Sequence, residues 1–424
     1  MPVLATPGVY IEEIDGLSLS ISSSATAVPV FVVGTVAQES WWWDEVNKPL
    51  RINTFSEFEK YMSDSDSKIS QSQNARTPQI SAATNVFLQR RNASNPHWST
   101  FSSLAKKQGS RTTGNGIEWD RHFAPALRAY FENGGGYCYL CPQDKLVDFV
   151  PAMSDVTLVV QAGQSDATGV IQQVCTPGSM KFGLLDGPKE GTLDAAYPNM
   201  VASDCTAIYY PWLKANWRVN DADGVPVDPD TISLVAPSAV VAGLICTVDR
   251  ERGVWKAPAN VAVKGGLRPA VKVGNRMQDT YTEKNKIAIN MIRDFEGRGT
   301  QVWGARTMSA SGNSWLYVPV RRLFDMAERD IKSALQSVLF EPNGPATWEV
   351  VRGAIDNYLF NLWKQGAFSG FSPQSSYFVH VGAGVTMNQS DIDAGILRVT
   401  VGLAVVRPTE YIVLELKQKI GSGA

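Results

Sequence analysis

The residue types that build metal and redox sites are few in this chain. Cys138 and Cys141 form a C-x-x-C pattern, whereas the other three cysteines stand alone. A metal or redox site needs two thiols that converge on one point. Here the pair falls on a strand that we predict over residues 137–140, where positions three apart face opposite sides. The pattern therefore favours buried structural thiols over a metal site.

Histidine and serine chemistry is equally weakly supported. His97, His122 and His380 are the three histidines, and none has a neighbouring motif that would make it a general base. No G-x-S-x-G nucleophile elbow occurs in the sequence. Alternating strand and helix patterns leave an α/β enzyme as one hypothesis, but the missing nucleophile and base argue against it. We predict a protein that is not an enzyme.

Glycine-rich and acidic stretches favour turns over ligand sites. Residues 134–136 and 265–266 lack the Gly-Lys-Ser/Thr that cradles phosphates. Residues 221–224 resemble a calcium loop, but with Gly224 at position six the first ligand would be Val219, which cannot bind calcium. We therefore interpret this stretch as a hairpin tip and predict no cofactor.

Composition narrows the class of protein further. The 424 residues are 44% hydrophobic, which is enough for a packed core. Lys and Arg total 39 against 41 Asp and Glu, so the basic excess of a nucleic-acid binder is absent. Residues 1–14 lack the features of a signal peptide, and the apolar stretch 235–248 is too short to span a bilayer. Five cysteines, an odd number, favour synthesis in the reducing cytoplasm.

The periodicity predicts strands and helices that could form one layered core. Residues 28–34 are a compact apolar run, typical of a strand buried on both faces. Apolar residues at helical spacing predict two amphipathic helices in the last third of the chain. The helices are predicted over 122–132, 323–339 and 348–362, and further strands over 156–160, 182–185, 207–210 and 397–406.

Residues 63–116 differ in kind from the rest. The segment holds 11 serines, and its seven basic residues outnumber its two acidic ones. Weak periodicity predicts a polar insertion on the surface. Just before it, Trp41, Trp42 and Trp43 are consecutive, which is consistent either with an interface anchor or with a loop folded under its own domain.

Both ends of the chain are strand-like. Residues 9–14 and 411–416 carry strand-forming residues, and in the latter Ile412, Leu414 and Leu416 alternate with Tyr411 and Val413. Residues 18–27 are rich in serine and other small residues, which is typical of a connector.

The motifs at both ends and in the interior resemble contractile tail sheath proteins, which form the outer cylinder of phage tails, R-type bacteriocins and extracellular injection systems. The resemblance is dense over 200–416, present at 1–35 and 121–140, and absent from 63–116. Tyr411 stands where the family often has Phe. The motifs that carry the resemblance are residues 6–14, 207–212, 235–238, 248–260, 303–307, 317–322, 340–343 and 407–413.

The resemblance implies an α/β fold of mixed α+β type, with a core sheet flanked by helices, extended terminal strand arms and an inserted outer domain. It divides the chain into an N-terminal arm and linker, a first part of the core, the polar insertion, a middle outer region, a C-terminal core domain and a C-terminal arm. The corresponding ranges are 1–27, 28–62, 63–116, 117–230, 231–406 and 407–424.

The resemblance also implies a function and its partners. Sheath subunits polymerise as stacked hexameric rings around an inner tube protein, and contraction drives the tube through a target envelope. Each subunit adds its two arms as strands to the sheets of neighbouring copies, which is β-augmentation. The arm residues are then Val9, Tyr10, Ile11, Glu12, Glu13, Ile14, Tyr411, Ile412, Val413, Leu414, Glu415 and Leu416.

Further expectations concern the other partners. We hypothesise that one face of helix 321–339 contacts the inner tube, with an ordinary solvated face as the alternative; its charged residues are Asp325, Glu328, Arg329, Asp330 and Lys332. Baseplate and terminal cap proteins are the remaining expected partners, with no nucleic acid and no direct membrane insertion. The protein would be made in the bacterial cytoplasm and become part of a particle. A minor sheath paralogue at the baseplate or cap is the alternative function.

Overall fold

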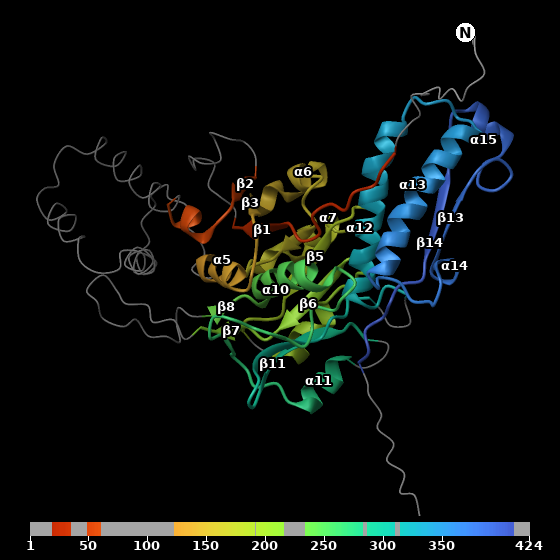
Figure 1. The fold of residues 1–424 in the computed structure, drawn as a ribbon. Helices are drawn as coiled ribbons and strands as arrows, with labels where there is room; N and C mark the ends of the chain where they lie inside the picture. The colour runs from red at the N-terminus through yellow and green to blue at the C-terminus, as the bar shows by residue number, and fades with distance from the viewer. Residues whose placement is uncertain are drawn as a thin grey trace, which may run out of the picture. The chain divides into compact units, whose positions relative to one another are not determined.

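The computed structural model describes residues 19–34, 49–60, 123–190, 192–215, 234–282, 286–309 and 314–410. The chain forms two compact units, one centred on Ser24–Met326 and the other on Ala327–Val406 (Figure 1). We call them the large unit and the small unit. Both predicted strand arms, the hairpin tip at 221–224, the three tryptophans and the insertion at 63–116 lie outside the described residues.

The large unit is built on a nine-stranded sheet in the order β2-β3-β1-β4-β5-β6-β11-β12-β9. The strands from β3 to β11 in this order run parallel, whereas β2, β12 and β9 pair antiparallel. The sheet continues across the predicted domain boundary at 230 and 231. Its strands are β1 (Pro29–Val33), β2 (Leu50–Ile52), β3 (Cys138–Pro142), β4 (Leu158–Val160), β5 (Phe182–Asp186), β6 (Thr206–Tyr210), β9 (Val261–Ala262), β11 (Ile289–Phe295) and β12 (Gly299–Trp303).

Helices cover both faces of this sheet, because its central strands are apolar on both sides. One core packs α5 (Phe123–Glu132) and α10 (Pro237–Arg252) against one face. The second core packs α6 (Leu146–Phe149), α7 (Thr168–Val174) and α11 (Asn275–Thr282) against the other. Every residue of β1 is buried, which confirms the prediction for 28–34. A short sheet of β7 (Leu213–Lys214), β8 (Leu234–Val235) and β10 (Arg268–Pro269), together with α8 (Leu193–Ala196), completes the large unit.

The two cysteines of the C-x-x-C pattern face opposite sides of β3, as predicted. Cys138 belongs to the core under α5 and α10, and Cys141 to the core on the other face. Burial raises the pKa of Cys141 to about 12, so its thiol stays protonated and unreactive at neutral pH. All five cysteines are free and buried.

The small unit pairs helices with a two-stranded sheet. The helix α12 (Val318–Leu335) runs from the large unit into it, followed by α13 (Pro345–Lys364), α14 (Pro373–Ser376) and α15 (Gln389–Asp393). The strands β13 (Tyr377–Val381) and β14 (Val399–Leu403) pair antiparallel, and β13 packs on α13. Both long amphipathic helices therefore confirm the predictions from periodicity, although α12 begins at Val318 and ends at Leu335.

A glycine sets how closely α10 approaches α5. A Cβ at Gly243 would come within 2.4 Å of the Tyr130 carbonyl oxygen. We expect Gly243→Ala to lower the free energy of unfolding by about 1–3 kcal/mol, because the helices must move apart. In α13, where a Cβ at Gly353 meets nothing within 4 Å, Gly353→Ala should instead raise stability by about 0.5–1 kcal/mol. Urea denaturation of both variants measures these opposite signs, and equal effects would contradict the packing argument.

Candidate assembly site at the roots of the two arms

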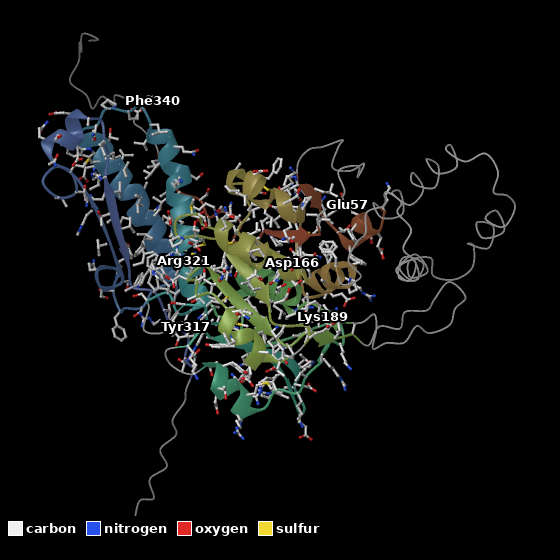
Figure 2. The ribbon with its side chains drawn as sticks, turned by 180° about the vertical axis from the view of Figure 1, so that it is seen from behind. Glu57, Asp166, Lys189, Tyr317, Arg321 and Phe340 are labelled. Carbon is white, nitrogen blue, oxygen red and sulfur yellow. The ribbon has the colours of Figure 1, made fainter. Side chains whose placement is uncertain are left out.

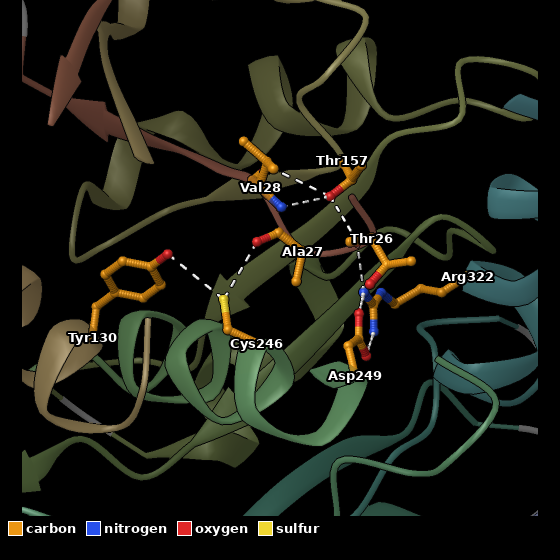
Figure 3. A network of polar contacts seen from close by, with 8 residues as sticks. All are labelled: Thr26, Ala27, Val28, Tyr130, Thr157, Cys246, Asp249 and Arg322. Atoms are coloured by element: carbon orange, nitrogen blue, oxygen red, sulfur yellow. Dashed lines mark hydrogen bonds and ion pairs between the residues drawn. The ribbon is translucent and has the colours of Figure 1, made fainter. Parts of the chain in front are cut away.

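The end of the predicted N-terminal connector, residues 18–27, is fixed to the core by a buried arginine. Arg322, in the first turns of α12, donates to both carboxylate oxygens of Asp249 at 3.0 and 2.6 Å. Its Nη2 also donates to the Thr26 carbonyl at 2.9 Å (Figure 3). Both charged side chains are 4% exposed. Burial alone would lower the pKa of Arg322, but the Asp249 carboxylate outweighs that effect and raises the pKa, so the guanidinium stays charged.

Further hydrogen bonds hold the same stretch where it enters β1. Thr157 Oγ1 donates to the Thr26 carbonyl at 2.8 Å and accepts the Val28 N–H at 3.0 Å. Cys246 Sγ donates to the Ala27 carbonyl at 3.4 Å (Figure 3). Three consecutive residues are thus bonded to Thr157, which directly precedes β4, and to α10 and α12. We call this network the N-terminal anchor; it comprises Thr26, Ala27, Val28, Thr157, Cys246, Asp249 and Arg322.

A second network holds the chain just before the predicted arm strand at residues 411–416. Arg306 Nε donates to Glu410 Oε1 at 2.9 Å, and its Nη2 bonds Glu410 Oε2. The Tyr317 hydroxyl donates to the same Oε2 at 3.3 Å. Burial, followed by the nearby Glu410 charge, raises the pKa of Tyr317, so its hydroxyl stays protonated and able to donate. We call Arg306, Tyr317 and Glu410 the C-terminal anchor.

The charged residues predicted on the inner helix face separate into two groups. Glu328 and Lys332 are exposed and Arg329 is partly buried. Asp325 is 5% and Asp330 is 2% exposed, so their predicted display at the surface is wrong. Asp325 accepts a hydrogen bond from Arg321 Nε at 2.9 Å, one turn earlier on α12. Figure 2 labels Arg321 on this helix. Asp330 accepts one from the Tyr358 hydroxyl at 2.8 Å, so both carboxylates have partners within the subunit.

A polar cluster lies where parallel α/β enzymes commonly bind ligands, at the carboxyl ends of the strands. Asp186, at the end of β5, accepts bonds from the Ser238 N–H at 2.7 Å, the Ser238 hydroxyl at 3.0 Å and the Gly163 N–H at 2.8 Å. Burial raises the pKa of Asp186 to about 6. These bonds tie the start of α10 to the strand ends, which accounts for the buried carboxylate without a ligand.

In the parts of the chain that the structure describes, no three His, Cys, Asp or Glu side chains gather as metal ligands would. Across those same parts, no helix combines the length and apolar character that crossing a membrane requires.

Comparisons with known proteins agree with this architecture. Residues 164–308 match the family model of the phage tail sheath protein central domain, and residues 310–419 match that of the phage tail sheath C-terminal domain. The PVC sheath complex of an extracellular contractile injection system, in its contracted state, is 39% identical; the match covers 99% of each chain with a TM-score of 0.73. The helical sheath of the anti-feeding prophage is 33% identical over 98% of this chain and 100% of that one, with a TM-score of 0.67.

The fold and these matches define a structural protein of the contractile sheath class. The chain belongs to the contractile tail sheath family and is a sheath subunit. A tail sheath protein of Vibrio phage KVP40 is 30% identical over 134 residues, which are 31% of this chain and 20% of the phage protein. The resemblance noted in the sequence is therefore confirmed, and so is the mixed α/β fold.

The ion-paired residues of both anchors lie in motifs that carry the family resemblance, but the motifs do not predict which residues pair. Asp249 lies in the 248–260 motif and Arg322 in the 317–322 motif, while Arg306 and Glu410 lie in two further motifs. The structure brings each pair together across long sequence separations. Thr26 and Thr157 carried no signal in the sequence.

Proposed function

We propose that this chain polymerises around an inner tube by exchanging its terminal strands with neighbouring copies, and that the sheath so formed contracts to drive the tube through a target envelope. One observation carries the proposal. The β13–β14 sheet has two strands, and among the described residues neither strand has a partner on its outer edge. An exposed edge strand can pair with a strand of another chain, and natural proteins usually block such edges unless the pairing is used.

The hydrogen-bond alternation indicates which groups are available to an incoming strand. The Ala404 N–H donates to the Ser376 carbonyl at 2.8 Å, directly beyond the β13–β14 ladder. Because bonded and non-bonded pairs alternate, Phe378–Gly402 and His380–Thr400 are hydrogen-bonded pairs. The N–H groups of Val379 and Val401 then point outward. Residues 9–14 and 411–416, which have strand-forming sequences, are the segments we assign to such edges.

The two anchors support the same proposal for the subunit that supplies the exchanged strands. A strand that is exchanged between subunits transmits force only if its root is held. The Thr26 carbonyl accepts a hydrogen bond from Arg322, at the end of the connector that follows the N-terminal arm, and Glu410 pairs with Arg306 directly before residues 411–416. The arm residues themselves stay a prediction, as do the domain ranges given by the resemblance.

The expected partners follow from this mechanism. They are other copies of the chain in stacked hexameric rings, an inner tube protein, and baseplate and terminal cap proteins, with no nucleic acid and no membrane insertion. For the tube contact, the exposed Glu328 and Lys332 and the partly buried Arg329 are the residues we retain. We further propose that the subunit is made in the bacterial cytoplasm, joins a phage tail or injection particle, and acts without catalysis or cofactor.

A role as a minor sheath paralogue is the second candidate. A chain in the baseplate of the anti-feeding prophage is 34% identical, covers 99% of this chain and has a TM-score of 0.66. A position at the baseplate is therefore compatible with this sequence. Assembly into long tubes by the chain alone would favour the major sheath role.

Deletion of residues 1–15 is expected to abolish the formation of long tubes, because each subunit then lacks one of the strands that link it to its neighbours. Negative-stain electron microscopy of wild type beside the deletion measures this. Tubes from both proteins would keep the sheath assignment but overturn the arm mechanism. If neither forms tubes, the minor paralogue becomes the better reading.

A further inference from the structure

The C-terminal anchor is built on a rigid local frame. The Arg306 N–H donates to Asn290 Oδ1 at 2.7 Å, and Asn290 Nδ2 donates to the Arg306 carbonyl at 2.8 Å. Arg306 Nη1 also donates to the Thr282 carbonyl at 2.7 Å. Gly304 permits this close approach, because a Cβ there would lie 2.8 Å from Asn290 Oδ1. The guanidinium is therefore held in place independently of Glu410.

Tyr317 belongs to the same frame. Arg306 and Tyr317 form an antiparallel β-bridge, flanked by the Val318 N–H to Ala305 carbonyl bond at 2.9 Å. Both groups that bind the Glu410 carboxylate thus come from one backbone pair. Side-chain exposure is 12% for Arg306 and 25% for Glu410, so the ion pair is mostly buried but still in contact with water. A fixed, fork-shaped donor set of this kind binds a carboxylate with defined geometry.

Glu410 lies where the chain has just returned from the small unit to the large unit. Residues 327–406 belong to the small unit, and the chain rejoins the large unit at Arg407. Glu410 lies immediately before the predicted arm strand at 411–416. A bidentate ion pair at that residue fixes the start of the arm on the large unit. Because Arg306, Tyr317 and Glu410 all belong to the large unit, this contact does not involve the small unit.

We propose that Arg306 and Tyr317 are positioning residues that latch Glu410, so that the C-terminal arm leaves the large unit from a fixed point. This inference rests on the proposed function, since it assumes that residues 411–416 are an exchanged strand. The latch also connects the two arm roots. From Arg306 the β-bridge leads to Tyr317, and the first turns of α12 lead on to Arg322 and Thr26. Tension between the arms passes through this short path.

Glu410→Gln tests the latch, because it keeps the shape of the side chain but removes the charge. In the unassembled full chain we expect amide hydrogen exchange at Thr409 and Glu410 to accelerate about tenfold, and tubes to form about tenfold more slowly. Glu296→Gln makes the same charge change at an exposed turn of the large unit and should alter neither rate. Tyr317→Phe removes only the hydroxyl and should act in the same direction with a smaller effect.

The outcomes separate the latch from the proposed function. Wild-type exchange and assembly rates in Glu410→Gln would overturn the latch. Faster exchange with unchanged assembly would also overturn it as a positioning device, leaving a local contact. If wild type itself forms no tubes, or the 1–15 deletion forms them normally, the proposed function fails, whereas the exchange measurement still reports whether Glu410 holds the root.

Discussion

Replacing Arg322 by methionine is expected to lower the free energy of unfolding by about 3–5 kcal/mol. Methionine fills the space of the aliphatic stem but leaves the Asp249 carboxylate buried without its cation. The Thr26 carbonyl also loses one of its two side-chain donors. Urea denaturation at a concentration where the chain stays unassembled, verified by light scattering, gives the difference.

Two matched variants isolate the cause. Arg352 pairs with Glu349 on the surface of α13, with side-chain exposures of 52% and 66%, so Arg352→Met should produce no measurable change. The double variant Arg322→Met, Asp249→Leu removes both charges and should recover most of the loss, because no buried charge remains unpaired. A single variant as stable as wild type would show that the ion pair does not hold the N-terminal root.

Hydrophobic periodicity predicts two kinds of element in this chain. One is the amphipathic helix, with one polar and one apolar side, and the other is the short strand made only of apolar residues. The strands β1, β4, β5 and β6 and the helices α12 and α13 belong to these classes. Periodicity does not predict the helix α10, although residues 235–248 are a conspicuously apolar stretch. Residues 237–248 are all buried, so no polar stripe marks the helical period.

The anchors could not be predicted from spacing, because their partners are far apart in the chain. Arg322 and Asp249 are separated by 73 residues, and Arg306 and Glu410 by 104. The misplacement of Asp325 and Asp330 has a related cause. A charged residue on an amphipathic helix usually faces water, but here Arg321 and Tyr358 supply buried partners that a helical pattern alone does not reveal.

The other large effect expected is on assembly, from a proline at the outer edge of β14. Val401→Pro should reduce tube formation by about tenfold or more, while the unassembled chain stays folded. Proline removes the outward N–H of residue 401 that we assign to bonding with an incoming strand, and an edge strand tolerates it. Electron microscopy counts the tubes, and circular dichroism of the unassembled chain verifies the fold.

The neighbouring residue provides the control, because side-by-side positions on a strand point their N–H groups in opposite directions. Thr400 lies opposite His380 in a pair that the alternation assigns as hydrogen-bonded, so Thr400→Pro should instead destabilise the small unit. Val379→Pro repeats the outward change on β13 and tests the other edge. If Val401→Pro and Val379→Pro both assemble like wild type, β13–β14 is not the acceptor. Among the described strands, the edges of the other two sheets then become the candidate acceptors: β2 and β9 of the nine-stranded sheet, and β8 and β10 of the short sheet.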